Sequence, residues 1–285
     1  MKRPLVVLII ICMLFVSIAI YSFDKSRESH SDDFKIIVVP GHEPSDGGAH
    51  YGDLYERDLN VDLAERMTEL MRSKNGYSVF VSRASGSWNH LLLEYFEKGR
   101  KDILDFKNRS QNLYRLFQSA GLITKVEDRM PHTEVSEEGA VRLYGLNKWA
   151  NDNDVDLLIH IHFNDSNRKD PALPGNNRGF TIFVPESQLK NSSASKAAAT
   201  FIYAALEKRF ASQGSNGHRL GLLEDQSLIA LGAFNTLVSP SVLIEYAYIY
   251  EGILSSPEMR EKTLSAMAEA TAEGVENYRQ NLRSK

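Results

Sequence analysis

The sequence predicts an α/β protein, built on an open mixed β-sheet with helices on both faces. Short runs rich in β-branched residues alternate along the chain with longer segments of helical periodicity. Such alternation is typical of strand and helix units that assemble into one sheet covered on both sides. The composition, with 42% hydrophobic and 25% charged residues, is that of a globular chain with a sizeable core.

Five segments have the composition of strands and five have the spacing of helices. The segment 35–39 is an apolar run that ends at Pro40-Gly41, so we expect a buried strand followed by a tight turn. From Asp58 onward, apolar residues recur at helical spacing until Asn75-Gly76 stops the helix. The remaining strands are expected at 79–81, 156–163, 180–184 and 242–249, and the remaining helices at 88–120, 137–150, 192–210 and 257–282.

Residues 1–23 predict attachment to a membrane. Lys2 and Arg3 precede an apolar run, 5–21, that only Ser17 interrupts. As a helix this run would be about 25 Å long, just enough to span the hydrocarbon of a bilayer. A cleavable signal peptide usually has a shorter apolar core and then a small-residue cleavage site. The sequence therefore favours an uncleaved signal-anchor transmembrane helix, with a cleaved signal peptide as the alternative.

The charges beside the apolar run predict its orientation. The positive charges at the amino end slightly exceed those just after the run, which favours an amino end inside the cell. The polar segment 24–34 would then be a linker. Residues 35–285 would form a single domain on the outer side of the cell membrane, in the periplasm or at the cell wall.

Charge and cysteine content exclude several classes of function. The net charge of −4 and the pI of about 6.1 argue against a nucleic-acid-binding surface, which should be strongly basic. Cys12 is the only cysteine, so the chain can form no intramolecular disulfide and no cysteine-based zinc site. Any metal must be held by histidines and carboxylates.

Residues of the required kinds stand at or just after the ends of the predicted strands. His42 follows the first strand, Glu56 precedes the first helix, His162 ends the strand 156–163, and Glu245 interrupts the apolar strand 242–249. In open α/β sheets such groups gather beyond the carboxyl ends of the strands. Two histidines and a carboxylate can form an open zinc site with water as the fourth ligand. A further carboxylate nearby could move a proton.

Each of these residues alone also has an ordinary structural explanation. His42 could be a loop histidine, Glu56 a favourable charge at a helix start, and Glu245 a buried ion-pair partner. His160 lies on the same strand face as His162 and could compete with it as a ligand. We expect the other histidines and aspartates near these motifs to be polar loop or surface groups: Asp46, His50, Asp53, Asp58, His132 and His218.

The order of the motifs is more specific than any single one. Pro-Gly-His, Glu-Arg-Asp-Leu-Asn, Ile-His-Phe-Asn and Val-Leu-Ile-Glu follow one another along the chain. This order resembles the zinc-dependent N-acetylmuramoyl-L-alanine amidases of the type 3 family. The resemblance implies that His42, Glu56 and His162 are the zinc ligands and that Glu245 is the catalytic glutamate. The segment that ends at Arg83 also resembles the second strand of that family.

The sequence departs from the family pattern beside these motifs. Val39 stands where the family usually has Asp, Glu43 and Pro44 replace two glycines, and His160 replaces a Ser. Phe163 and Asp165 stand where small residues are usual. These changes put substrate affinity and specificity in question more than metal binding.

The segment 85–129 is an addition to the family pattern, and its residues predict a helical insertion. It could form a lid, a wall of the substrate site or a docking site for a protein activator, and the sequence does not choose among these.

The resemblance implies zinc-dependent hydrolysis of the amide bond between N-acetylmuramic acid and L-alanine in peptidoglycan, for cell-wall remodelling or daughter-cell separation. Zn²⁺ would polarise the carbonyl and acidify its water, and Glu245 would act as base and then as acid. One alternative is a non-catalytic cell-wall-binding or regulatory protein with the same fold. Another is a zinc peptidase that cuts a different peptidoglycan amide. The chain lacks the glycine-rich motif of P-loop nucleotide-binding enzymes and the Gly-x-Ser-x-Gly motif of serine hydrolases.

Overall fold

A computed structural model describes residues 33–284, apart from residues 44, 127–134, 167, 216–217 and 220. The transmembrane segment expected at 1–23 and nearly all of the linker expected at 24–34 lie outside these residues. Among the residues described, no helix is both long and apolar enough to cross a membrane.

The central sheet has six strands in the order β11-β8-β12-β7-β1-β4. Strands β4, β1, β7 and β12 run parallel to one another, β8 pairs antiparallel with β12, and β11 pairs parallel with β8. This arrangement confirms the open mixed sheet that the sequence predicts. The strands span Phe34–Pro40 (β1), Tyr77–Val81 (β4), Leu157–Asn164 (β7), Thr181–Pro185 (β8), Leu222–Asp225 (β11) and Ser241–Tyr248 (β12).

Strand β11 is the element of this sheet that the sequence analysis did not predict. It is a four-residue edge strand that ends in Glu224 and Asp225. An edge strand pairs on one side only, so it needs neither the length nor the continuous apolar run that marks a central strand.

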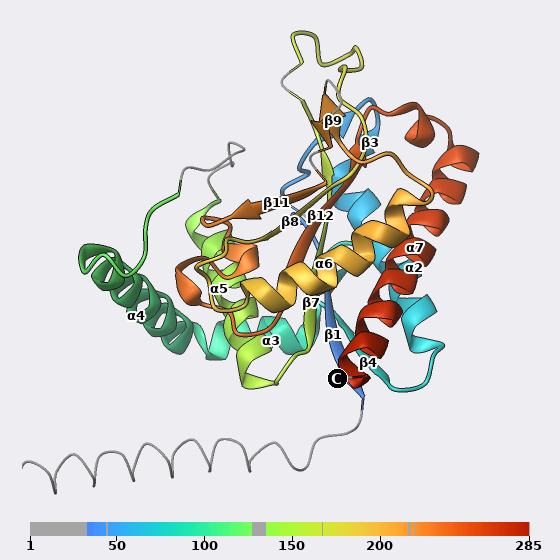
Figure 1. Cartoon of the computed structure of the whole chain (residues 1–285). Helices are drawn as coiled ribbons and strands as arrows, with labels where there is room; N and C mark the ends of the chain where they lie inside the picture. Colours follow the sequence, from blue (N-terminus) through green and yellow to red (C-terminus); the bar gives the residue numbers. More distant parts are fainter. Residues whose placement is uncertain are drawn as a thin grey trace, which may run out of the picture. The chain divides into compact units, whose positions relative to one another are not determined.

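Helices cover both faces of the sheet, as expected (Figure 1). One face carries α2 (Glu56–Arg72), α6 (Ser192–Glu207) and α7 (Pro257–Arg283), whose apolar residues share one core cluster with the strands. The other face carries α3 (His90–Lys98), α5 (Glu137–Asp152) and the short 3₁₀ helices η1 (Ile229–Leu231) and η2 (Ala233–Asn235). Figure 1 shows α4 (Arg100–Ser119) extending away from the sheet beside α5.

The segment expected to be one helix from 88 to 120 is two helices, which corrects that prediction. A hairpin of β5 (Arg83–Ala84) and β6 (Ser87–Trp88) precedes them, and Gly99 separates α3 from α4. A side chain at Gly99 would lie 2.6 Å from the carbonyl oxygen of Tyr95, so the junction depends on glycine. The helices occupy most of the segment 85–129.

The remaining elements are short. Strands β2 (His50–Tyr51) and β3 (Leu54–Tyr55) form a hairpin just before α2, and β9 (Gly214–Ser215) pairs with β10 (His218–Arg219). A third 3₁₀ helix, η3, spans Gly252–Leu254.

Alternation along β7 decides which residues reach the site. Ile159, Ile161 and Phe163 belong to the core cluster under α2, α6 and α7. Because neighbouring side chains in a strand point to opposite faces, His160 and His162 point to the other face. The following strand is in register, with Glu245 of β12 paired to His162. Two sequence-predicted site residues therefore lie side by side on the same face of the sheet.

Candidate metal centre

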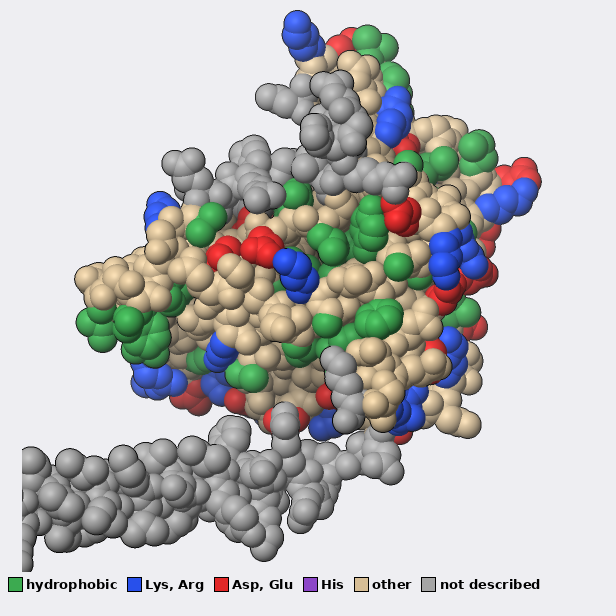
Figure 2. Space-filling model, in the orientation of Figure 1, with side chains coloured by type: hydrophobic (Ala, Val, Ile, Leu, Met, Phe, Trp, Pro, Cys, Tyr) green, Lys and Arg blue, Asp and Glu red, His purple; other side chains and the backbone are tan. Residues whose placement is uncertain are grey.

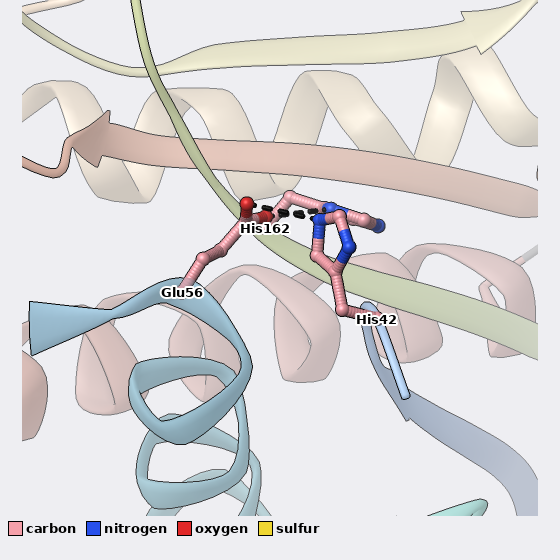
Figure 3. A group of neighbouring side chains, drawn as sticks. All are labelled: His42, Glu56 and His162. Atoms are coloured by element: carbon pink, nitrogen blue, oxygen red, sulfur yellow. Dashed lines mark hydrogen bonds and ion pairs between the residues drawn. The ribbon is translucent and has the colours of Figure 1, made fainter. Parts of the chain in front are cut away.

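Three separate segments meet at the carboxyl ends of β1 and β7. His42 comes two residues after β1, Glu56 is the first residue of α2, and His162 lies near the end of β7. One ligand atom from each residue falls within 4.8 Å of the other two. Figure 3 shows the three side chains pointing toward one another from these elements. The structure thus brings together the three residues that the sequence motifs single out as ligands.

The carboxylate of Glu56 lies between the two imidazoles. Its Oε2 is 2.9 Å from Nε2 of His42, and its Oε1 is 2.9 Å from Nδ1 of His162. The backbone amides of Ala49 and Phe163 also donate to these oxygens, at 2.8 Å and 3.1 Å. Glu56 is buried, and these contacts fix its orientation.

The electrostatics of the cluster favour a cation. Burial alone would lower the pKa of His42, but the carboxylates of Glu56 and Asp46 raise this pKa to about 9. Burial opposes ionisation of Glu56, yet hydrogen bonds from His162 and His42 lower its pKa well below the usual value. Without a metal, a proton must lie between each of these imidazole nitrogens and the Glu56 oxygen that it faces. A bound metal ion would take the place of these protons. Two imidazoles and one carboxylate are the donors of His₂Glu zinc sites, so the residues fit a metal.

The backbone around the cluster is shaped to leave room for these side chains. His42 has φ of 63°, a left-handed conformation that is uncommon and costly for a residue other than glycine. A Cβ at Gly48 would lie 2.5 Å from the His42 ring and 2.6 Å from Oε2 of Glu56. Gly48 also has a positive φ of 64°, so two requirements keep this position a glycine.

Asp46 is a site residue that the sequence analysis placed among the polar loop groups. Its Oδ2 lies 3.1 Å from Nδ1 of His42, and its Oδ1 accepts from the amide of Gly48 at 3.2 Å. A carboxylate on the second nitrogen of a metal-binding imidazole fixes the ring's orientation and tautomer. The position of Asp46, four residues after His42 in a glycine-rich loop, was the available signal.

Glu245 presents an unsatisfied carboxyl oxygen next to the cluster. Its Oε2 is buried and has no hydrogen-bond partner among the residues described. Burial raises its pKa well above the usual value, the negative charge of Glu56 adds to this, and His42 opposes it. No ion pair with Glu245 is found in the described part of the chain, so the buried salt-bridge explanation gains no support.

His160 lies two residues before His162 in β7 and does not belong to the cluster. It is buried, and its ring makes a hydrogen bond to the backbone of Ala230 in η1. Burial lowers its pKa to about 3, with His162 contributing. His160 is therefore a neutral core histidine, and the structure does not bring it into the ligand set.

The other polar residues considered from the sequence lie apart from the ligand atoms. The ring of His50 stacks on Tyr55 with centroids 5.9 Å apart, Asp53 is exposed in the β2–β3 hairpin, and Asp58 pairs with Arg57 at 3.5 Å. His132 and the side chain of His218 lie outside the described part of the chain.

Comparison with known proteins identifies the family. Residues 36–277 match the family model described as N-acetylmuramoyl-L-alanine amidase. No curated protein sequence matches the chain.

Three solved amidases illustrate the shared fold. The CwlD amidase from Clostridioides difficile, in complex with the GerS lipoprotein, is 18% identical with a TM-score of 0.56, over 87% of this chain and 99% of that one. Ami1 from Mycobacterium smegmatis is 16% identical with a TM-score of 0.54, over 90% and 100%. AmiC2 of Nostoc punctiforme is 17% identical with a TM-score of 0.52, over 88% and 99%.

At these identities, the solved structures show that the fold is shared. The family match covers most of the chain and confirms the resemblance that the sequence motifs indicate. The chain therefore belongs to the N-acetylmuramoyl-L-alanine amidase family and is a peptidoglycan amidase.

Proposed function

We propose that this amidase uses Zn²⁺ to hydrolyse the bond between N-acetylmuramic acid and L-alanine, with His42, Glu56 and His162 as ligands and Glu245 as the proton carrier. One observation carries the proposal. The three ligand atoms converge within 4.8 Å, and a carboxyl group with a free oxygen lies beside them on the neighbouring strand.

The metal would be held by Nε2 of His42, Nδ1 of His162 and the Glu56 carboxylate, since these atoms face one another. Zn²⁺ held there would supply Lewis-acid chemistry toward the scissile carbonyl and would lower the pKa of water. Asp46 holds the His42 ring through its Nδ1, which leaves Nε2 directed toward Glu56 and the metal position.

Glu245 moves the protons in this proposal. Its carboxylate takes a proton from the attacking water and passes it to the nitrogen that leaves with L-alanine. Burial raises the pKa of Glu245 above its usual value, and a carboxyl group with a raised pKa accepts a proton more readily than an exposed one does.

Metal analysis tests the ligand set. We expect the full chain to bind one Zn²⁺, His162→Ala to lose it, and His160→Ala to retain it. An empty His160→Ala variant beside a zinc-loaded His162→Ala variant would show that the ligand assignment is wrong.

Product analysis tests the reaction. Purified sacculi incubated with the enzyme should release peptides with a free L-alanine amino terminus, and a chelator should stop the release. A new amino group elsewhere in the peptide would identify a zinc peptidase, and no cleavage with zinc bound would support a wall-binding role.

We further propose that residues 5–21 anchor the enzyme in the cell membrane, with the amidase domain on the outer side, where peptidoglycan lies. There it would serve wall remodelling or daughter-cell separation. Apolar burial and not charge would hold the anchor, so the full chain should stay in the membrane fraction after a carbonate wash. Recovery of a soluble chain that begins after Tyr21 would show cleavage instead.

A protein activator is the partner that we propose for the segment 85–129. Within it, Ile103 and Tyr114 are the only buried residues of α4. Leu113 and Leu116 of the same helix are 51% and 61% exposed. Figure 2 shows hydrophobic side chains gathered at the edge of the molecule that α4 occupies. One similar amidase was solved in complex with a lipoprotein, which is consistent with regulation by a protein.

A further inference from the structure

We propose that Arg83 is a positioning residue that sets the spacing of the three candidate metal ligands, and that Asn60 assists it at the turn that carries His42. The proposal rests on the ligand set described under the proposed function. It assigns a role to two buried side chains whose hydrogen bonds go to backbone carbonyls of the ligand-bearing segments.

The Gly41 carbonyl is the centre of this arrangement. The amide of Gly41 still belongs to the sheet, where it donates to the Ile161 carbonyl of β7 at 2.8 Å. The Gly41 carbonyl accepts instead from Nη2 of Arg83 at 2.5 Å and from Nδ2 of Asn60 at 3.1 Å. These two bonds hold the peptide that leads directly into His42, whose φ of 63° needs support from its surroundings.

Arg83 also reaches the segment that carries Glu56. Its Nε donates to the Pro40 carbonyl at 3.3 Å, and its Nη2 donates to the Arg57 carbonyl at 3.0 Å. Arg57 follows Glu56 in the first turn of α2. One planar guanidinium therefore joins the end of β1 to the start of α2, and its rigid geometry fixes the distance between the two.

The third ligand rests on the same turn. A Cβ added to Gly41 would lie 2.2 to 2.6 Å from atoms of the His162 ring, so the ring packs directly against the Gly41 backbone. Moving Gly41 would shift the support of His162 together with His42. The Arg83 contacts thus reach all three ligand segments.

Burial of Arg83 and Asn60 destabilises the fold. Arg83 is 2% exposed and Asn60 is fully buried. Arg83 has no carboxylate within ion-pair distance in the described part of the chain, and Oδ1 of Asn60 has no hydrogen-bond partner there. A buried charge without a direct ion pair and a buried unpaired oxygen both oppose folding. Their shared contact is the turn beside the metal ligands, which points to positioning.

Titration of the metal-free full chain, purified in mild detergent, with Co²⁺ and then with competing Zn²⁺ tests the inference. Arg83→Lys keeps the charge but cannot span carbonyls on two segments. We expect Co²⁺ and Zn²⁺ to bind about 10–100-fold more weakly, the effect typical of residues that orient ligands, with an altered visible spectrum of the cobalt form.

Arg72→Lys is the matched control. Like Arg83, Arg72 donates to backbone carbonyl oxygen, but its acceptor is Val79 of β4, at 3.3 and 2.7 Å, and it lies at the far end of α2 from Glu56. We expect this variant to lower the melting temperature and to leave metal affinity unchanged. A purely structural role for Arg83 would give the same pattern in Arg83→Lys and would overturn the inference.

Asn60→Leu tests the positioning role at the Gly41 carbonyl if Arg83→Lys does not fold. It removes the donor to Gly41 together with the unpaired oxygen, so the metal-free protein should melt at the same or a higher temperature while binding Co²⁺ more weakly. Wild-type affinity in this variant would contradict the proposal. If the wild-type chain itself bound neither metal, the proposed function would fail, which separates the two outcomes.

Discussion

The two faces of the sheet are built differently. Under α2, α6 and α7 lies one continuous apolar cluster to which every strand of the central sheet except β11 contributes buried residues. Under α3, α5 and the 3₁₀ helices the apolar residues divide into separate clusters. This second face also carries buried polar groups, among them His160 and Asn147, and residues with positive φ, Phe234 and Asn235.

The site residues of the strands belong to the second face. His162 and Glu245 point to it, and α4 exposes leucines beyond it. The comparison teaches that one face supplies the larger share of the apolar burial that stabilises the fold, whereas the other carries the two strand residues of the site. Stability and function should therefore respond separately to substitutions on the two faces.

Glu245→Gln should have the largest effect, a loss of catalysis without a loss of stability or metal. The amide is nearly isosteric and cannot accept a proton, so turnover should fall by about 10²–10⁴-fold. Zinc content should be retained, and the melting temperature should hold or rise, because a buried ionisable group with a raised pKa is removed. Peptide release, metal content and thermal melting measure this. A stable, zinc-loaded variant with near wild-type turnover would remove Glu245 from the mechanism.

Gly274→Ala should affect stability alone, on the apolar face. The added Cβ would lie 2.5 Å from Cα of Ile202, where α7 crosses α6. We expect a loss of about 1–3 kcal/mol in the free energy of unfolding from overpacking, although alanine favours a helix by about 1 kcal/mol over glycine. Urea unfolding measures this, with turnover per folded molecule unchanged.

Gly139→Ala in α5 is the control for that change. Its Cβ would approach only side chains, Oγ of Ser136 at 3.2 Å and Val135 at 3.7 Å, so we expect no loss of stability and, from helix propensity, a gain of at most about 1 kcal/mol. Equal losses from both substitutions would mean that the two faces do not differ in packing.

Asp46→Asn should weaken the metal site by a smaller factor. The amide keeps the shape of the side chain but loses the charge that holds Nδ1 of His42 at 3.1 Å. We expect Zn²⁺ to bind about tenfold more weakly, at the low end for such residues because Asp46 is exposed. Asp53→Asn, in the exposed turn of the neighbouring hairpin, should leave the affinity unchanged. Equal Zn²⁺ affinities for the two variants would show that Asp46 does not orient His42.

Leu116→Gln should have the smallest effect on the isolated enzyme. Leu116 is 61% exposed, so the free energy of unfolding should change by no more than about 0.5 kcal/mol. Basal turnover should also stay the same. If the activator stimulates this variant less than the wild type, the partner surface lies on α4. A lower basal turnover would show instead that α4 acts on the site directly.

Much of this protein followed from the sequence because local chemistry carried the information. Apolar β-branched runs marked the central strands. His42 and His162 stood at or near strand ends, Glu56 at the start of a helix and Glu245 inside an apolar strand. The edge strand β11 and the break at Gly99 were missed, because a short polar strand and a single glycine inside a helical pattern leave weak local signals.

Other features were decided only by the tertiary structure. Alternation put His160 and His162 on one face, but it did not say that η1 would cover His160 while Glu56 approached His162. The contacts of Asp46 with His42, and of Arg83 with the Gly41 and Arg57 carbonyls, likewise depend on how distant segments meet. The physical reason is that a strand's sequence fixes the direction of its side chains, whereas the depth and partners of each side chain depend on the loops and helices that pack over it.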